Sequence, residues 1–288
     1  PMNVCDRNEM RALLAKHGFH FSKAKGQNFL AAAWVPEQIA VEAGVGPDCG
    51  VVEIGPGIGS LTQQLCRHAG KVVAIEVDRS LQPVLAETMA GYENLEILWQ
   101  DALKTDLAAL VMEKFPGLQP MACANLPYYI TSPVLVCLLE AKCFSSVTVM
   151  VQKEVALRIC AAPGTTNYSA FTIFCNYYAQ PALLFDVPPS CFVPQPKVTS
   201  TVLQLTCRTE PPCTLLDEAL FFRVVKASFA QRRKMLVNGL CAAFPGYSKA
   251  EMAGVLESCG FAPTIRGETL SLDGFAVLAN ELARRAQA

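Results

Sequence analysis

Four consecutive residues, Asn125-Leu126-Pro127-Tyr128, carry groups that could hold a flat amine. The side-chain oxygen of Asn125 can accept an N–H hydrogen bond. Pro127 has a fixed φ and biases the residue before it toward an extended conformation, which lets the Leu126 carbonyl point outward as a second acceptor. The ring of Tyr128 offers a face on which a base can stack. Asn-x-Pro is also common turn chemistry, so an ordinary strand-to-helix turn is the alternative.

Residues 51–61 favour a nucleotide site, because they read as a strand, a glycine turn and a helix. Gly55, Gly57 and Gly59 would let the backbone approach a ligand closely. Their spacing differs from the dinucleotide fingerprint Gly-x-Gly-x-x-Gly, which would require glycine where Ser60 stands. The turn therefore indicates a nucleotide-like cofactor and is a weak signal for NAD.

Two acidic residues follow the next two predicted strands. Glu76 comes twenty-one residues after Gly55, where a carboxylate can accept both hydroxyls of a ribose. Asp101, next to Ala102, is placed to accept the exocyclic amine of an adenine. Read alone, each acid could equally be a helix N-cap or part of a solvated turn. Taken with the glycine turn and Asn125, they resemble the strand-end residues of the S-adenosylmethionine (AdoMet) methyltransferases of the seven-stranded Rossmann-like fold. This resemblance implies AdoMet as the cofactor, and NAD-dependent oxidoreduction is the alternative.

The elements that must position these residues alternate between apolar, strand-like runs and helical patterns. Such alternation predicts βαβ units and a mostly parallel sheet. A Pro-rich segment joins the last two strands, so an antiparallel edge pair is expected there. Strands are expected at 51–54, 71–75, 95–98, 121–124, 147–151, 182–187 and 198–205, with helices near 36–44, 60–68, 80–90, 132–141, 152–160 and 169–178.

A linker at residues 209–212 (Thr-Glu-Pro-Pro) divides the chain into an expected catalytic domain, 1–208, and a helical domain, 209–288. Residues 1–30 are expected to form a helix followed by a basic, glycine-containing arm. The C-terminal pattern predicts a small all-α domain. Its helices are expected at 216–228, 232–243, 249–258 and 272–286.

Composition narrows the class of protein. The 288 residues are 52% hydrophobic with a net charge of −1, which allows a sizeable core and argues against disorder. The thirteen cysteines are never closer than six residues, which excludes Cys-x-x-Cys zinc and redox sites. With no visible signal peptide, we interpret them as reduced thiols of a cytoplasmic protein. Three histidines leave little material for a metal site, and no apolar run approaches the ~20 residues of a membrane span.

Three further segments carry a family resemblance: residues 25–30 (Lys-Gly-Gln-Asn-Phe-Leu), 192–198 (Phe-Val-Pro-Gln-Pro-Lys-Val) and 229–234 (Phe-Ala-Gln-Arg-Arg-Lys), the last expected to open a helix. With residues 125–128, they make the chain resemble the ribosomal RNA adenine N6,N6-dimethyltransferases over almost its whole length. It is similar to the small-subunit branch. Leu126 and the helical C-terminal region favour that branch over the macrolide-resistance enzymes of the large subunit, which usually have Ile there. Lys25 is a departure, since the family often has Leu.

The resemblance implies a Rossmann-like, seven-stranded class I AdoMet-dependent methyltransferase domain of the α/β class, with a small all-α C-terminal domain. It implies N6,N6-dimethylation of two adjacent adenosines in the 3′-terminal hairpin loop of 16S rRNA during ribosome biogenesis. The residues suit this chemistry. Because the N6 lone pair is delocalised into the adenine ring, two acceptors on its hydrogens would favour the pyramidal geometry of attack. The remaining catalysis is mostly positioning, and no strong base is required.

The resemblance also implies the roles of individual residues. Tyr128 and Phe192 would sandwich the target adenine after it leaves its stack, whereas a core plug is the alternative for Phe192. The catalytic residues are expected to be Asn125, Leu126, Pro127, Tyr128 and Phe192. The cofactor-binding residues are expected to be Gln27, Asn28, Leu30, Gly55, Gly57, Glu76, Asp101, Ala102 and Asn125, with no metal.

Basic residues gather in two parts of the chain. Residues 219–250 hold six basic residues and no acidic one, while residues 1–30 hold five basic and two acidic ones. This segregation suits a near-neutral protein that holds RNA phosphates on one face. The resemblance implies that this RNA is small-subunit rRNA within an immature ribosomal particle, and we expect the protein to be a monomer. A solvated helix face is one alternative, and a non-catalytic module that monitors ribosome assembly is another. The expected RNA-binding residues are Lys23, Lys25, Lys197, Arg223, Arg232, Arg233 and Lys234.

Overall fold

The computed structural model describes residues 2–22 and 25–288, so Lys23 lies outside the described residues. The chain forms two compact units. The first runs to Ala156 and includes Gln180–Cys207, and the second comprises Leu157–Ala179 and Arg208–Ala288.

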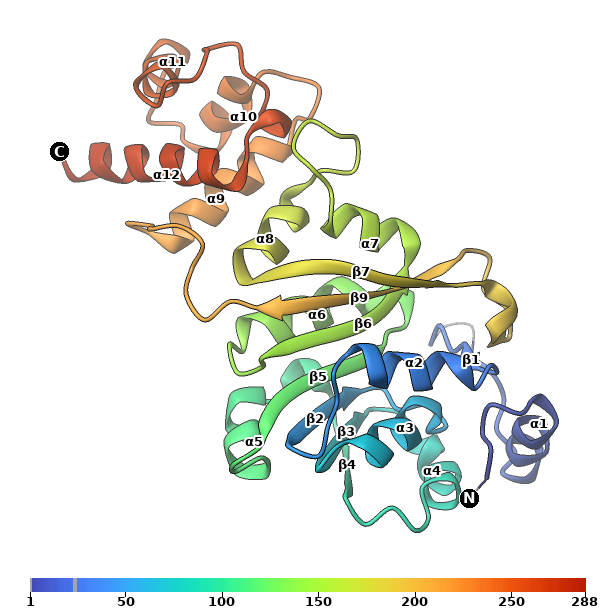
Figure 1. Cartoon of the computed structure of the whole chain (residues 1–288). Helices are drawn as coiled ribbons and strands as arrows, with labels where there is room; N and C mark the ends of the chain where they lie inside the picture. The colour runs from blue at the N-terminus through green and yellow to red at the C-terminus, as the bar shows by residue number, and fades with distance from the viewer. Residues whose placement is uncertain (1, 23–24) are drawn as a thin grey trace. The chain divides into compact units, whose positions relative to one another are not determined.

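A seven-stranded sheet forms the centre of the first unit, in the order β4-β3-β2-β5-β6-β9-β7 (Figure 1). Strands β4 to β6 pair in parallel, whereas β9 is antiparallel to β6. The predicted α/β class with seven strands is confirmed. The strands are β2 (Cys49–Ile54), β3 (Lys71–Glu76), β4 (Leu95–Trp99), β5 (Gln119–Asn125), β6 (Ser146–Gln152), β7 (Ala179–Val187) and β9 (Ser200–Cys207).

The strand order reverses between β2 and β5, because the chain first adds β3 and β4 on one side and then crosses to the other. In open α/β sheets, ligands bind outside the carboxyl ends of the strands at such a switch point. Every residue of β2 is buried, as expected for a central parallel strand covered on both faces (Figure 1). The helices of this part are α1 (Arg7–Lys16), α2 (Trp34–Glu42), α3 (Ser60–His68), α4 (Gln82–Thr88), α5 (Leu107–Lys114), α6 (Thr131–Glu140) and α7 (Lys153–Ile159).

Three short or isolated elements of the first unit were not predicted from sequence. Helix α5 lies between β4 and β5, and its N-cap is Asp106, whose side chain accepts a hydrogen bond from Ala109 N. Strands β1 (Phe29–Leu30) and β8 (Phe192–Val193) pair antiparallel, with Leu30 opposite Phe192. A strand of two residues has no periodicity to detect, so only the folded chain reveals this pair.

The second unit is helical, and it contains a segment that the expected domain boundary assigned elsewhere. Its helices are α8 (Ala170–Tyr178), α9 (Glu218–Phe229), α10 (Leu236–Ala243), α11 (Lys249–Ser258) and α12 (Leu272–Gln287). Tyr168 and Tyr177 are buried in one apolar cluster with Phe221 and Phe275, which explains why Leu157–Ala179 belongs to this unit. The bounds of the compact units therefore differ from the expected domain bounds, 1–208 and 209–288. The assignment of catalysis to the first of these domains and RNA binding to the second stays a prediction.

The basic segment at residues 229–234 does not open a helix. Helix α9 ends at Phe229, residues 230–234 form a turn, and α10 begins at Leu236. The prediction of a helix from Arg232 onward was therefore wrong for its first turn. In the turn, the Arg232 side chain donates to the backbone carbonyls of Thr166 and Tyr168. Among the described helices, none combines the length and apolar character that crossing a membrane requires.

Candidate active site

A cavity of about 480 Å³ lies at the carboxyl ends of the parallel strands, where the strand order reverses. This volume falls in the range of small-molecule and cofactor sites, about 300–1,000 Å³. Its lining comes from the arm, the glycine turn after β2, the ends of β3, β4 and β5, and single residues of β8 and β9. All of these segments belong to the first unit.

The glycine turn borders the cavity with three residues in the left-handed region: Gly55 at φ 72°, Gly57 at φ 59° and Gly59 at φ 97°. A Cβ at Gly59 would lie 3.0 Å from both Met89 Sδ and Thr88 Oγ1, so this position is closed by packing. A Cβ at Gly55 would meet no atom within 4 Å, although the residue lines the cavity. The backbone at Gly55 is thus open on the side where a ligand would approach.

Glu76 ends β3 and is buried, with the whole residue 7% exposed. Its Oε1 accepts from the backbone N–H of Gly57 at 3.3 Å, and its Oε2 accepts from that of Asp78 at 3.0 Å. Burial raises the pKa of this carboxyl, and the two backbone hydrogen bonds oppose that rise. A carboxylate has about four acceptor sites, so Glu76 retains capacity for a ligand diol.

Asp101 follows β4 and lines the same cavity together with Ala102. Its Oδ1 accepts from the backbone N–H of Leu103 at 2.9 Å and so caps the short 3₁₀ helix Ala102–Lys104. The capping role that a lone aspartate suggests is therefore real. Within the described part of the chain, no hydrogen bond reaches Oδ2, which leaves one oxygen available to an amine in the cavity.

Residues 125–128 present two acceptors at the end of β5. Asn125 pairs with Met150 in the sheet, and the N–H of Leu126 donates to the Met150 carbonyl at 3.3 Å. Pro127 then turns the chain at φ −57°, and its own carbonyl accepts from Thr131 Oγ1 at 3.2 Å. Across the residues that the structure describes, neither the Asn125 amide nor the Leu126 carbonyl takes part in a hydrogen bond. Both remain able to accept the hydrogens of an amine.

Two aromatic residues line the cavity close to these acceptors. Tyr128 is half-buried, and its hydroxyl lies 3.4 Å from Ser200 Oγ at the start of β9. Phe192 is only 2% exposed in β8, where it lies opposite Leu30. Phe192 is thus part of the cavity wall, and a base could reach its ring only from inside the cavity.

The arm closes one side of the cavity through contacts that the sequence did not reveal. Lys25 Nζ lies 2.9 Å from Asp78 Oδ2, and Gln27 Nε2 donates to the same oxygen at 3.2 Å. The side-chain oxygen of Gln27 accepts from the backbone N–H of Ser22 at 3.2 Å. Both the oxygen and the nitrogen of the Gln27 amide therefore form hydrogen bonds within the protein. The Asn28 amide nitrogen donates to the Gly26 carbonyl at 3.2 Å.

The lining residues that the sequence analysis did not assign to the site include Asp78, Tyr129 and Ser200. Asp78 stands two positions beyond Glu76, at the end of the same strand, and this was the one available signal. Tyr129 is 60% exposed and packs on the arm, because a Cβ at Gly26 would lie 3.3 Å from its ring. Ser200 could not be found, since its closeness to Tyr128 depends on how the strands are ordered.

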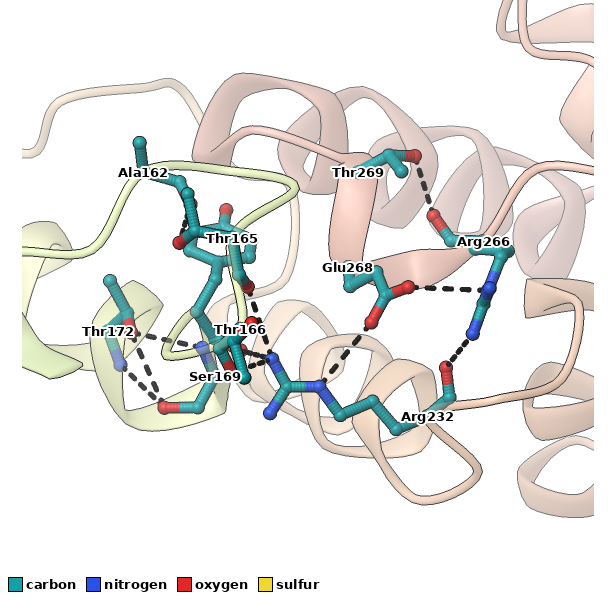
Figure 2. A network of polar contacts seen from close by, with 10 residues as sticks. Ala162, Thr165, Thr166, Ser169, Thr172, Arg232, Arg266, Glu268 and Thr269 are labelled. Atoms are coloured by element: carbon teal, nitrogen blue, oxygen red, sulfur yellow. Dashed lines mark hydrogen bonds and ion pairs between the residues drawn. The ribbon is translucent and has the colours of Figure 1, made fainter.

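The residues expected to bind RNA fall into two groups. Lys197, Arg233 and Lys234 are exposed, and no ion pair or hydrogen bond engages their side chains within the described residues. The three other residues that the structure describes are engaged within their own unit, and Lys23 lies outside the described residues. Arg223 stacks 4.2 Å above the ring of Phe244 and donates to the Ala243 carbonyl. Lys25 pairs with Asp78, and Arg232 is bound to backbone carbonyls and Glu268 (Figure 2).

The described residues include no cluster of three or more His, Cys, Asp or Glu side chains that could hold a metal ion. The thirteen cysteines are all free thiols, six of them buried. Burial is the main reason that the pKa values of the six buried thiols, including Cys49 and Cys191, are raised. They therefore offer little thiolate for nucleophilic chemistry.

Comparison with known proteins gives a consistent picture. The family model for ribosomal RNA adenine dimethylase matches residues 18–264. The chain is 46% identical over 284 residues to the ribosomal RNA small subunit methyltransferase A of Geobacillus thermodenitrificans, covering 97% of each. It is 44% identical over 283 residues to the protein of the same name from Alkaliphilus metalliredigens, covering 98% of this chain and 99% of that protein.

Solved structures agree with the sequence relatives. A dimethyladenosine transferase from Plasmodium falciparum is 27% identical with a TM-score of 0.74, covering 90% of this chain and 98% of that one. The 23S rRNA methyltransferase ErmE is 26% identical with a TM-score of 0.65, covering 89% of this chain and all of that one.

Proposed function

Because this chain belongs to the ribosomal RNA adenine dimethylase family, we propose that it dimethylates N6 of two adjacent adenosines in the 3′-terminal hairpin loop of small-subunit rRNA. It is a methyltransferase, and its relatives at 44–46% identity bear the name of the small-subunit enzyme. The observation that carries the proposal is the pair of unengaged acceptors, Asn125 Oδ1 and the Leu126 carbonyl, at the rim of a cofactor-sized cavity.

We propose AdoMet as the methyl donor, which supplies an electrophilic methyl group when it is bound. The open space beside Gly55 suits a ligand that lies against the glycine turn. Glu76 has acceptor capacity for a ribose diol, and the free oxygen of Asp101 suits the exocyclic amine of an adenine. Asn28 and Leu30 approach the same cavity from the arm, whereas the amide of Gln27 acts mainly in holding the arm to Asp78.

The two acceptors, Asn125 Oδ1 and the Leu126 carbonyl, form the proposed amine clamp, which explains how the chain's own residues would assist the transfer. Two acceptors on the N6 hydrogens draw the lone pair out of conjugation, an interaction gained mostly in the transition state. Stacking on Tyr128 would hold the base, once it has left its helix, with N6 in line for attack. Tyr128 is itself steadied by Ser200. The proton released from N6 can pass to solvent, so no buried general base is needed.

The biological setting is also proposed. The substrate is small-subunit rRNA within an immature ribosomal particle, and the exposed cations of the second unit support that choice. The protein is proposed to act as a monomer. Thirteen free cysteines support a reducing compartment and hence the cytoplasm.

A methylation assay tests the function directly. Purified protein is incubated with labelled AdoMet and small subunits that lack dimethyladenosine, and the rRNA nucleosides are then mapped by mass spectrometry. We expect dimethyladenosine at two adjacent positions. A folded protein preparation that binds AdoMet but produces no dimethyladenosine would overturn the proposal.

A second candidate is a binding role in ribosome assembly that does not require methyl transfer. The observation that favours it is a separate compact unit with its own exposed cations, Arg233 and Lys234. This role predicts that Asn125→Ala still binds the particle while losing methylation. The two roles can coexist. NAD-dependent oxidoreduction is not supported, because the family consists of methyltransferases.

A further inference from the structure

A cluster of polar contacts in the second unit joins three segments that are far apart in the sequence (Figure 2). The segments are the loop at residues 162–168, the basic turn at 230–234, and residues 266–270. Arg232 connects them. Its Nη2 donates to the backbone carbonyls of Thr166 at 2.5 Å and Tyr168 at 2.6 Å, with that of Thr165 at 3.3 Å.

Glu268 holds the other side of the same guanidinium. Its Oε2 lies 3.4 Å from Arg232 Nε, and its Oε1 lies 3.3 Å from Arg266 Nε. Arg266 Nη2 then donates to the Arg232 carbonyl at 3.0 Å, which closes the ring of contacts. The backbone adds a direct link, because Gly164 N donates to the Glu268 carbonyl at 2.7 Å.

The loop depends on these contacts. Residues 162–167 are exposed and lie outside any helix or strand, and their backbone links within the loop are two turn bonds, from Thr165 N to the Ala162 carbonyl and from Tyr168 N to the Thr165 carbonyl. Arg232 uses two nitrogens of one planar group, because Nη2 faces the three carbonyls while Nε faces Glu268. A guanidinium has a rigid fork of donors, whereas the ammonium of lysine is a single point charge on a flexible stem. The arrangement therefore uses the shape of arginine as well as its charge.

We propose that Arg232 is a positioning residue, which holds the loop at residues 162–168 against the basic turn instead of contacting rRNA phosphates. Phosphate binding in this turn then falls to its neighbours Arg233 and Lys234. This inference rests on the proposed function only for the identity of the RNA. It divides the run Arg232-Arg233-Lys234 into one structural and two RNA-binding residues, which the sequence alone presents as three equivalent cations.

The environment of the neighbours supports this division. Arg233 and Lys234 are exposed, and no described residue forms an ion pair or hydrogen bond with their side chains. A phosphate contact there requires no existing bond to be broken. Two nitrogens of Arg232, Nε and Nη2, are already bound to Glu268 and to three carbonyls, so a phosphate contact through either would break an existing bond, and within the described residues only Nη1 has no partner.

Two measurements on matched variants test the proposal. Hydrogen exchange, followed by mass spectrometry, reports the protection of amides in residues 162–168. Binding to small subunits that lack dimethyladenosine, measured over a salt series, reports phosphate contacts through the slope of log K against log salt. The variants are Arg232→Lys, Arg232→Gln, Glu268→Gln, Arg233→Lys and Arg233→Gln.

For the positioning residue, we expect Arg232→Lys and Glu268→Gln both to raise exchange in the loop. Arg232→Gln should weaken binding while leaving the salt slope as in wild type. For its neighbour, Arg233→Gln should reduce the slope by about one and leave loop exchange unchanged. Arg233→Lys should bind like wild type, because a phosphate contact needs only the charge.

The opposite pattern overturns the proposal. It consists of wild-type loop exchange in Arg232→Lys, or of a slope reduced by about one in Arg232→Gln. Protection of α9 and α12 amides in the same experiment shows whether a variant is folded, and Glu268→Gln tests the cluster without touching a cation. Neither measurement needs methyl transfer, so a wild-type protein that binds but does not methylate defeats the proposed function alone.

Discussion

Lys25 Nζ lies 2.9 Å from Asp78 Oδ2, and this ion pair ties the arm to the strand end that carries Glu76. Burial raises the pKa of the Asp78 carboxyl, but hydrogen bonds from Ser80 and Lys25 outweigh it, so the net pKa is lowered. Lys25 is the position where the family resemblance departs from its usual Leu. The pair therefore gives the departing residue a role in closing the cofactor cavity.

Replacing Lys25 with Met should weaken AdoMet binding modestly. The Lys25 side chain is 50% exposed, so the pair is worth at most about 1 kcal/mol, or up to about fivefold in affinity. Calorimetry at two salt concentrations checks this. Wild-type affinity should fall with salt more than that of Lys25→Met. Lys197→Met removes an exposed lysine without this pair and should bind AdoMet like wild type.

Replacing Asn125 with Ala should reduce methylation by about 10²–10³-fold, the usual cost of losing one group that stabilises a transition state. AdoMet binding should fall less, since other residues share that role. Asn125→Asp keeps an acceptor oxygen and should retain more activity than Asn125→Ala. Single-turnover rates with saturating AdoMet measure both. Equal rates for Asn125→Ala and wild type would remove Asn125 from the mechanism.

Three glycine-to-alanine variants distinguish the loss of room for AdoMet from the cost of placing alanine at a positive φ. A Cβ at Gly55 meets no protein atom, so Gly55→Ala should fold with a strain cost of about 1–2 kcal/mol but lose AdoMet affinity more than tenfold. Gly91 also has a positive φ, 89°, with open space around it, and does not line the cavity. Gly91→Ala should show the strain alone.

Gly59→Ala provides the opposite case, because its Cβ would lie 3.0 Å from Met89 and Thr88. It should lower the unfolding free energy more than the other two. Thermal denaturation with and without AdoMet distinguishes the three variants. Full AdoMet affinity in Gly55→Ala would mean that the cofactor does not lie against this turn.

Phe192 can be tested as a stacking residue against the alternative of a core plug. The ring is 2% exposed, so Phe192→Ala should cost about 3–5 kcal/mol whatever its role. Phe192→Leu retains most of the apolar volume and should cost under about 1.5 kcal/mol. If the ring stacks on adenine, Phe192→Leu should raise KM for the particle or lower kcat. A folded Phe192→Leu with wild-type kinetics indicates a core plug.

Glu53 should make stability depend on pH. Burial raises the pKa of this carboxyl from 4.5 to about 8, against the opposing hydrogen bond from Thr62. Because the folded state then binds more protons than the unfolded state between these values, stability falls as pH rises from 4.5 toward 8. Between pH 6 and 8, ionisation of Glu53 should lower the free energy of unfolding by on the order of 2 kcal/mol. Urea unfolding of wild type and Glu53→Gln measures this, and parallel pH profiles would contradict it.

The sequence indicated the strands of the main sheet and the residues at their ends, because apolar runs and glycines are local signals. It placed Glu76, Asp101 and Asn125 at three successive strand ends, and the fold brings all three to one cavity. Their neighbour Asp78 was missed, since its partners Lys25 and Gln27 lie about fifty residues earlier in the chain. An ion pair across such a distance leaves no trace in a local pattern.

By itself, then, the sequence determined the class of fold, the order of the strand-end residues and the two acceptors of the proposed amine clamp, since each depends on residues close together in the chain. Only the tertiary structure decided which cations are free. Arg232 and Arg233 are adjacent and identical in type, yet one is bound to a loop more than sixty residues away and the other is exposed. The physical reason is that a guanidinium's partners are set by the packing of distant segments, which no property of the residue itself reveals.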